Sequence, residues 1–332
     1  MALLAFWAAW AGLWALLRLL CSLIERLQFL KAKRSLSVER EWWRVTIRYS
    51  SAPDGGLAGG LSTQQRRWLR RWFSCGAAAG LMAACASMAL LVTELHALLG
   101  PAQASAAGAD AVAGPRLQLA LPGVTLPASH ALPLWLALAV SLAAHEAGHA
   151  LAAAAEGVRV SGAGLSLLLL LPAAFVELDS ADLAALSRAS MLRVATAGVW
   201  HNAALGLACW AALPALPVSG GGGAAAGAVA GALLSFLRLL LGYTVSLSAA
   251  LALLNMAPVH GLDGQQALEA ALLRPRLPAK ELPDHSDPGA TGSGHGSSKG
   301  RRAGAVRWAL HAGTAAYAAV VLLHMARLQS SS

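Results

Sequence analysis

Residues 131–155 read ALPLWLALAVSLAAHEAGHALAAAA, an apolar run long enough to cross a bilayer, which takes about 20 residues in a helix. Glu146 is the only Asp, Glu, Lys or Arg in this run, and a histidine stands on either side of it. Ionisable side chains inside a membrane span are costly and usually mark a functional site. The run therefore predicts a membrane helix that contributes residues to a functional site.

The polar residues of this run form an H-E-x-x-H motif. His145 and His149 are four residues apart, so on a helix they share one face and can bind one zinc ion. Glu146 is placed to take a proton from the attacking water and pass it to the leaving amine. A hydrogen-bonded cluster between helices is the alternative interpretation. We favour a zinc endopeptidase with one Zn²⁺ per chain.

Two histidines leave a zinc site short of a protein ligand. Asp263 is the favoured third ligand, because it follows an apolar run in NMAPVHGLDG (255–264), whose Pro and Gly residues indicate a bend that turns the carboxylate inward. Glu177, which also follows an apolar run, is the competitor, and His260 is a weaker candidate. The residues alone leave this choice open.

The chain has only two asparagines, and each lies beside a polar turn in an apolar region. Asn202 ends the sequence AGVWHN (197–202), and Asn255 begins NMAPVHGLDG. A carboxamide offers both a donor and an acceptor, so these side chains can hold a substrate strand or a developing oxyanion. Hydrogen bonding between helices is an almost equally good interpretation.

Composition indicates a membrane protein that crosses the bilayer several times. Of 332 residues, 57% are hydrophobic and 12% are charged, about half the charge of a soluble domain. These values exclude a soluble globular protein, a disordered chain and a disulfide scaffold. The net charge of +9 lies in blocks that flank apolar spans, which favours a role in orientation over direct nucleic-acid binding. The four cysteines, without a CxxC pair, are expected to be small buried hydrophobes.

The expected fold is an all-α polytopic membrane protein with about six transmembrane helices. A small re-entrant or β element is expected at 158–178, after the zinc-binding helix, because glycines and Pro172 interrupt that apolar run. The segment EWWRVTIRYS (41–50) is expected to be a short strand or an interfacial segment. The predicted spans are 2–24, 73–99, 131–155, 191–213, 232–256 and 305–327.

The spans divide the chain into six parts. Basic residues are concentrated in two loops, and the positive-inside rule places such loops in the cytosol. The catalytic site then lies toward the cytosolic side of the membrane. The parts are a transmembrane anchor (1–24), a basic cytosolic loop (25–72), a second span with a charge-poor loop (73–130), a catalytic membrane core (131–272), a disordered polar loop (273–303), and a C-terminal span with its tail (304–332).

HEAGH, AGVWHN and the N-x-x-P-x-x-x-L-D-G spacing together resemble the site-2 protease family of intramembrane zinc metalloproteases, most closely its eukaryotic members. The similarity covers about residues 118–210 and 245–270. It implies that His145, His149 and Asp263 are zinc ligands and that Glu146 is the catalytic base. It also implies that Asn202 and Asn255 help to hold substrate.

The resemblance further implies the partners and the location. The family cleaves single-span membrane proteins that another protease has already trimmed, typically membrane-tethered transcription factors, and its eukaryotic members lie in Golgi or ER membranes. Those members carry a long lumenal insertion, PDZ-like and Cys-rich, where this chain has only a Gly-rich linker at about 214–231. We therefore expect a short form that lacks most of this insertion.

Two other functions fit parts of the sequence. A CAAX-type membrane metalloprotease would use a glutamate ligand, which makes Glu177 the test residue. A non-catalytic transporter or scaffold would bind a metal or carry protons through the same histidines and aspartate, without needing Glu146 as a base.

Overall fold

The computed structural model describes most of the chain from the first strand onward. Most of the predicted anchor at 2–24 falls outside the described residues, as do 218–224 of the linker at 214–231 and 274–294 of the polar loop at 273–303. The described residues are 36–50, 59–99, 125–169, 171–217, 225–273 and 295–330, with isolated positions at 12, 14, 15, 18, 19 and 22.

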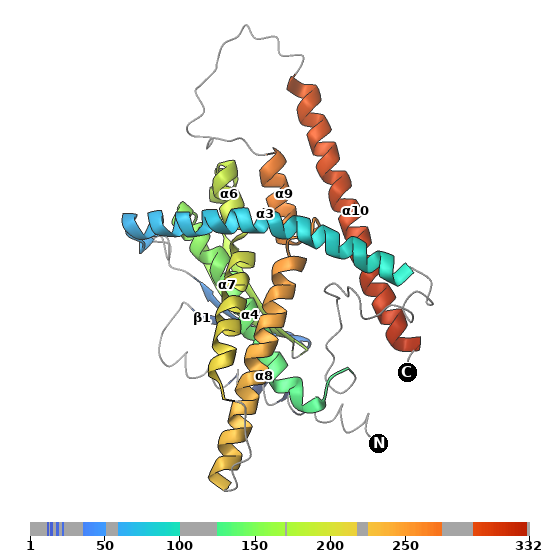
Figure 1. Cartoon of the computed structure of the whole chain (residues 1–332). Coiled ribbons are helices and arrows are strands. Elements are labelled where there is room, and N and C mark those ends of the chain that lie inside the picture. Colours follow the sequence, from blue (N-terminus) through green and yellow to red (C-terminus); the bar gives the residue numbers. More distant parts are fainter. Residues whose placement is uncertain are drawn as a thin grey trace.

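The described part is mainly helical, with one small sheet (Figure 1). The longer helices are apolar along most of their length, as the sequence predicts. In chain order the elements are β1 (Leu36–Arg40), β2 (Arg44–Ser50), α3 (Thr63–Leu99), α4 (Ala131–Glu156), β3 (Val160–Leu168), β4 (Leu171–Leu178), α5 (Ser180–Ala184), α6 (Arg188–Ala195), α7 (Ala197–Ala212), α8 (Ala225–Leu254), α9 (Asp263–Leu273) and α10 (His295–Ser330).

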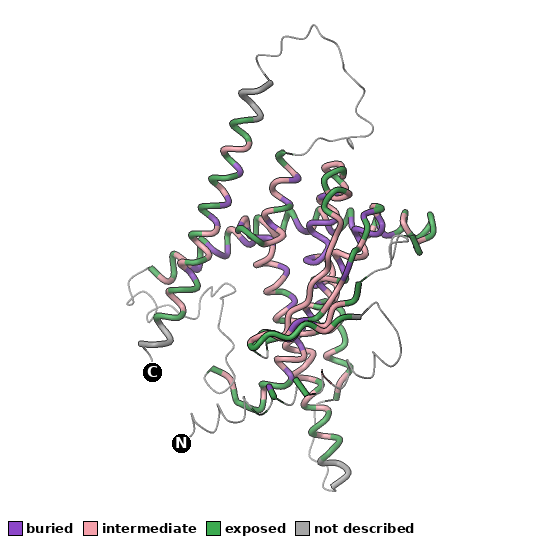
Figure 2. Tube along the Cα trace, turned by 180° about the vertical axis from the view of Figure 1, so that it is seen from behind, coloured by how far each residue is buried: buried purple, intermediate pink, exposed green. Residues whose placement is uncertain are grey.

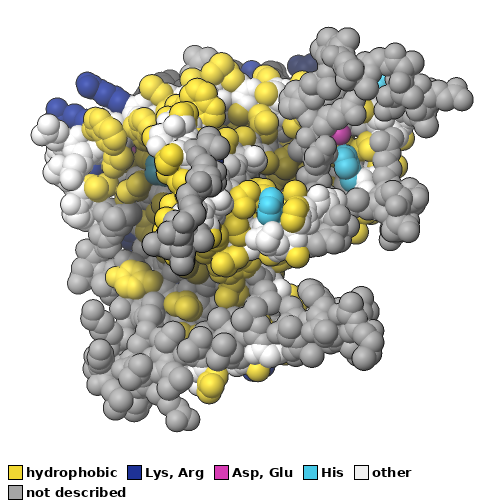
Figure 3. Space-filling model, turned by 60° about the horizontal axis from the view of Figure 1, so that its bottom comes forward, with side chains coloured by type: hydrophobic (Ala, Val, Ile, Leu, Met, Phe, Trp, Pro, Cys, Tyr) yellow, Lys and Arg dark blue, Asp and Glu magenta, His cyan; other side chains and the backbone are white. Residues whose placement is uncertain are grey.

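Four described helices are long and apolar enough to cross a membrane: α3, α4, α8 and α10. They correspond to four of the six predicted spans, so the count of about six is not confirmed. Large hydrophobic side chains remain exposed on these helices, as expected for surfaces that face lipid. Figure 3 shows such side chains spread over the described part of one face. Cys75 and Cys85 are likewise exposed on α3, which corrects the expectation that they are buried.

The predicted span at 191–213 is instead divided into α6 and α7 at Thr196. The Thr196 hydroxyl donates to the Leu192 carbonyl, and its backbone leaves the helical path, with φ −95° and ψ −2°. Because α7 has 16 residues, it is shorter than the length needed to span a bilayer. Hydropathy alone could not reveal this break, since the predicted span is mainly apolar on both sides of Thr196.

The sheet is antiparallel with the strand order β1-β2-β3-β4. β3 and β4 form a hairpin over the region expected to be re-entrant or β, and β2 forms within 41–50. A buried hydrogen bond of 2.8 Å between Thr46 and Ser166 joins β2 to β3. Figure 2, seen from behind, shows the sheet lying across one side of the helices, where β4 packs against α4. β4 is an edge strand of the described sheet.

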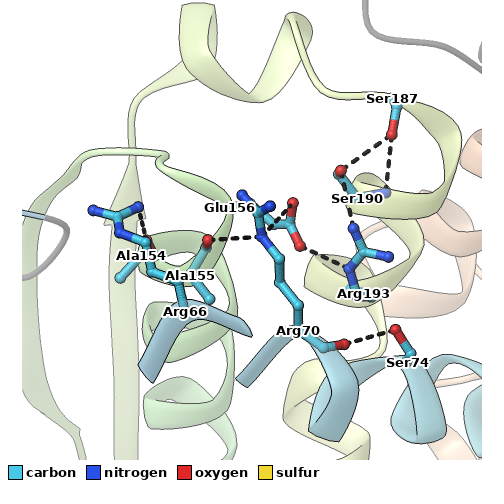
Figure 4. Close-up of polar contacts among 9 residues, drawn as sticks. All are labelled: Arg66, Arg70, Ser74, Ala154, Ala155, Glu156, Ser187, Ser190 and Arg193. Carbon is cyan, nitrogen blue, oxygen red and sulfur yellow. Dashed lines mark hydrogen bonds and ion pairs between the residues drawn. The ribbon is translucent and has the colours of Figure 1, made fainter. Parts of the chain in front are cut away.

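The helix α4 occupies the centre and contacts α7, α8 and β4, while α3 runs across it in Figure 1. The C-terminal end of α4 is held by arginines from other helices (Figure 4). Arg66 and Arg70 of α3 donate to the carbonyls of Ala154 and Ala155, each over 3.1 Å. Such bonds satisfy carbonyls that the end of a helix leaves unpaired.

The same end of α4 carries a buried carboxylate. Glu156, whose side chain is 4% exposed, pairs with Arg193 of α6 at 2.7 Å and with Arg70 at 3.6 Å. We call these three residues the Glu156 cluster. The cluster joins α3, α4 and α6 at one point (Figure 4). Glu156 lies two helical turns beyond His149 on α4.

Candidate metal centre

Three side chains from two helices bring one ligand atom each to a common point. His145 Nε2 and His149 Nε2 lie 3.2 Å apart, and Asp263 Oδ2 lies 3.1 Å from the first and 3.3 Å from the second. In a tetrahedral zinc site with bonds of about 2.0–2.1 Å, neighbouring ligand atoms are roughly 3.3 Å apart. The three atoms therefore have the spacing of one face of a zinc tetrahedron.

The environment of Asp263 supports the same assignment. Its buried Oδ2 atom faces these two ring nitrogens but makes no well-aligned hydrogen bond among the described residues. A buried polar oxygen without a partner is costly unless something else satisfies it, and a cation between the three ligand atoms would do so. Burial alone would raise the pKa of Asp263, but the facing His149 and His145 lower it more, so the carboxyl is ionised and ready to bind a cation.

The loop before α9 directs Asp263 toward the histidines. Gly261 has φ +85°, a left-handed conformation that glycine adopts without strain. The Gly264 amide donates to the Asn255 carbonyl over 2.7 Å, and a Cβ at Gly264 would overlap the Ala257 carbonyl. Both glycines thus close the loop so that Asp263, in the first turn of α9, returns to α4.

His149 is oriented for metal binding by a backbone carbonyl. Its Nδ1 atom lies 2.9 Å from the Val194 carbonyl oxygen of α6. Because a carbonyl only accepts, Nδ1 must carry the hydrogen and donate it, and this leaves the lone pair of Nε2 free for the metal.

Two glycines let α7 lie directly against this part of α4. A Cβ at Gly148 would lie 2.5 Å from the Ala197 carbonyl oxygen. A Cβ at Gly198 would lie 2.5 Å from both His145 Nε2 and His149 Nε2. Gly198 therefore forms a wall of the metal centre and keeps the space between the ligand atoms open. It stands within AGVWHN, where no sequence pattern distinguishes it from its neighbours.

Glu146 lies beside the ligands and at the sheet. Its carboxylate accepts a hydrogen bond from the backbone amide of Val176 in β4. Val176 is opposite Ala163 in the β3–β4 ladder, and an amide that points to α4 points away from β3. The outer edge of β4 therefore faces the predicted catalytic base.

The remaining predicted residues fall into two groups. Asn202 and Asn255 both contact His145: Asn202 Nδ2 is 3.1 Å from Nδ1, and Asn255 Nδ2 is 3.4 Å from Nε2. Glu177 and His260 are not in the ligand group. Glu177 pairs with Arg48 at 3.1 Å, and the exposed His260 donates its backbone amide to Thr314. Among the described residues, His145, His149 and Asp263 are the one group of three or more potential ligands.

Comparison with known proteins agrees with this centre. Residues 133–282, which include all three ligand residues, match peptidase family M50. The chain is also similar to a protein of Arabidopsis thaliana named membrane-bound transcription factor site-2 protease homolog, with 30% identity over 152 residues. That alignment covers 45% of this chain and 28% of the Arabidopsis protein. No solved structure matches the chain. The similarity of residues 133–282 to peptidase family M50 and the likeness to the site-2 protease homolog both support a membrane metalloprotease.

Proposed function

We propose that the protein is a zinc-dependent intramembrane endopeptidase that hydrolyses the transmembrane segments of membrane-tethered proteins. The observation that carries this proposal is the triangle of ligand atoms on His145, His149 and Asp263, with edges of 3.1–3.3 Å, beside Glu146. The triangle is built on a helix apolar enough to cross a membrane, so a peptide bond within the bilayer is the accessible substrate.

Zinc held by these ligands would supply a Lewis acid and make a water molecule nucleophilic near neutral pH. Glu146 takes the proton that this water loses as its oxygen adds to the peptide carbonyl carbon. Glu146 then gives the proton to the leaving nitrogen as the carbon–nitrogen bond breaks. Asn255 Nδ2, beside the ligand atom of His145, is placed to donate to the oxygen of the tetrahedral intermediate.

The substrate must be extended at the cut, because a helix hides its backbone carbonyls. We infer that the substrate adds to the outer edge of β4 as a strand, a common mode of peptide recognition. The hydrogen bond from Val176 to Glu146 supports this route, since it puts the outer edge of β4 beside the base.

An apolar cavity supports the same route. It has a volume of about 170 Å³ and lies between α4 and the sheet, where Trp135 and Leu142 face Leu165 and Pro172. Trp135 and Leu142 share the helix face of Glu146, so the cavity lies along the same face of α4 as the catalytic base. Its lining suits the apolar side chains of a former transmembrane helix.

The wider setting of this activity follows the family. We propose single-span substrates, in particular transcription factors already trimmed by another protease, a Golgi or ER membrane, and a site that faces the cytosol. The name of the Arabidopsis relative supports the substrate class.

Zinc content and cleavage of a single-span transcription-factor substrate, measured on the purified protein in detergent, test the proposal. We expect the wild type to bind about one zinc per chain and to cleave. Glu146→Gln should retain zinc without cleaving, and Asp263→Asn should lose both. Glu177→Gln is the matched control, because Glu177 also lies beside this region but pairs with Arg48. This variant should bind zinc and cleave as the wild type does.

Each alternative function makes a different prediction. A CAAX-type enzyme would lose cleavage with Glu177→Gln and keep it with Asp263→Asn. A transporter or scaffold would bind zinc without any difference in cleavage between the wild type and Glu146→Gln. Either result would reject the proposal.

A further inference from the structure

The ring of His145 has a polar partner on the side that faces away from the ligand atoms. Asn202 of α7 is fully buried, with 0% exposure, and its Nδ2 atom lies 3.1 Å from His145 Nδ1. Its Oδ1 atom is buried without a hydrogen-bond partner among the described residues. Because Asn202 contacts the metal-ligand residue His145 directly, its first effect is on His145 and not on a substrate.

An amide and an imidazole can pair in two ways. When the amide nitrogen donates to Nδ1, the hydrogen of the neutral ring is on Nε2, and that atom cannot bind a metal. When the amide oxygen accepts from the Nδ1 hydrogen, the lone pair of Nε2 is free. A half-turn about χ2 of Asn202 exchanges its oxygen and nitrogen. The second pairing also gives the buried oxygen the donor that it lacks.

We propose that Asn202 is a positioning residue whose side-chain oxygen accepts a hydrogen bond from His145 Nδ1 and so holds His145 in its metal-binding form. His149 supports this assignment, because its Nδ1 atom faces a group that can only accept, the Val194 carbonyl. Each ligand histidine then has an acceptor of its own behind it, one on α6 and one on α7. This inference rests on the metal centre of the proposed function but not on proteolysis.

Metal affinity is the direct readout of this role. Loss of an outer partner of a ligand histidine typically weakens metal binding about 10- to 100-fold. We would measure zinc affinity by competition with a chromophoric chelator, and the visible absorption of the Co²⁺-loaded protein, in detergent. Neither measurement depends on a substrate.

Three variants separate the acceptor role from other roles. Asn202→Leu removes the acceptor, whereas Asn202→Asp keeps an acceptor and removes the donor. Ser141→Ala is the matched control, since it removes another fully buried polar contact of α4, the 3.1 Å pair with Ser248, one turn before His145. Thermal unfolding without metal compares the folds, and Asn202→Ala replaces Asn202→Leu if the latter does not fold.

We expect Asn202→Leu to bind zinc 10- to 100-fold more weakly and to change the Co²⁺ spectrum. Asn202→Asp should bind zinc at least as tightly as the wild type, and Ser141→Ala should match the wild type in both measurements. Equal zinc affinity of Asn202→Leu and the wild type would overturn the inference. So would an Asn202→Asp variant as weak as Asn202→Leu, because the amide would then act as a donor.

The outcome is separable from that of the proposed function. A wild type that binds zinc and responds to these variants, yet cleaves no substrate, rejects the protease and retains the role of Asn202. A wild type that cleaves, with zinc affinity indifferent to Asn202→Leu, rejects the role of Asn202 alone.

Discussion

Gly198 shows how one missing side chain can define a metal centre. The helix α7 passes so close to α4 that a Cβ at this position would lie 2.5 Å from the ligand nitrogens of both His145 and His149. The displaced atoms would be the ligands themselves, held from behind by hydrogen bonds, so they cannot move aside without losing their geometry. The glycine is therefore a requirement of the site and not of helix formation, which it weakens.

Replacing Gly198 by alanine should remove the metal. We expect Gly198→Ala to bind zinc at least 100-fold more weakly than the wild type and to lose cleavage, measured as zinc per chain and as cut substrate. Gly206→Ala makes the same change on the same helix, where the new Cβ would be in ordinary contact at 3.4 Å from Ser248 Cβ. It should keep its zinc and gain up to about 1 kcal/mol from better helix propensity. Stoichiometric, tight zinc binding by Gly198→Ala would refute this account.

The sequence could predict part of the centre at this scale and not the rest. The four-residue spacing of His145 and His149 is a local property of a helix, so the motif alone suffices for that pair. The choice between Asp263 and Glu177 depends on how a distant loop folds back onto α4, and residue chemistry did not decide it. The role of Gly198 could not be predicted from the sequence either, because it arises from the close approach of α4 and α7, which are separate in the sequence.

At the scale of elements, the edge of β4 connects the fold to the proposed reaction. Residues two apart in an antiparallel strand direct their amides to the same side. The Val176 amide points toward Glu146, so the Ala174 amide also points away from β3, toward the space where a substrate strand would lie. Proline is tolerated on such an edge because the amide it removes is not part of the ladder.

Ala174→Pro should therefore impair substrate binding while sparing the metal. We expect cleavage to fall at least tenfold and zinc per chain to remain at the wild-type value, because the ligands come from α4 and α9. Ala174→Val is the control, since it keeps the amide and suits a strand, and it should cleave nearly as well as the wild type. Equal cleavage by the proline and valine variants would remove β4 from the substrate path.

The elements themselves were predictable where the signal is local. Apolar length predicts α3, α4, α8 and α10, although α3, α8 and α10 begin before the predicted spans because hydropathy does not mark helix ends. Glycines and Pro172 indicated the β3–β4 region. The pairing of β2 with β3 was not predictable, since β2 precedes α3 in the sequence and β3 follows α4. The register of a pair so far apart in the sequence depends on tertiary packing.

At the scale of the molecule, the Glu156 cluster fixes the metal-binding helix to two others (Figure 4). Its buried carboxylate pairs with Arg193, the residue next to Val194, whose carbonyl accepts from His149. The same cluster reaches α3 through Arg70. Helices α4 and α6 are thus joined at two points on one side, of which one holds a ligand histidine and the other holds the helix end.

Breaking this cluster should destabilise the whole chain. Removing one partner of a buried ion pair costs about 3–5 kcal/mol, because a charge remains buried without a partner. Arg70 is half exposed, so we expect the lower part of that range, about 3 kcal/mol, for Glu156→Ala. The measurement is the free energy of unfolding of the metal-free protein in detergent with a chemical denaturant.

The exposed pair of Glu41 and Arg44, at 2.9 Å, is the matched control for this prediction. Both partners are more than one-third exposed, so solvent screens the interaction and Glu41→Ala should cost only about 0–1 kcal/mol. If both variants lost the same small amount, the cluster would be an ordinary surface pair. If Glu156→Ala alone is destabilised, and its zinc affinity also falls, then the anchoring of α4 to α6 supports the orientation of His149 as well as the fold.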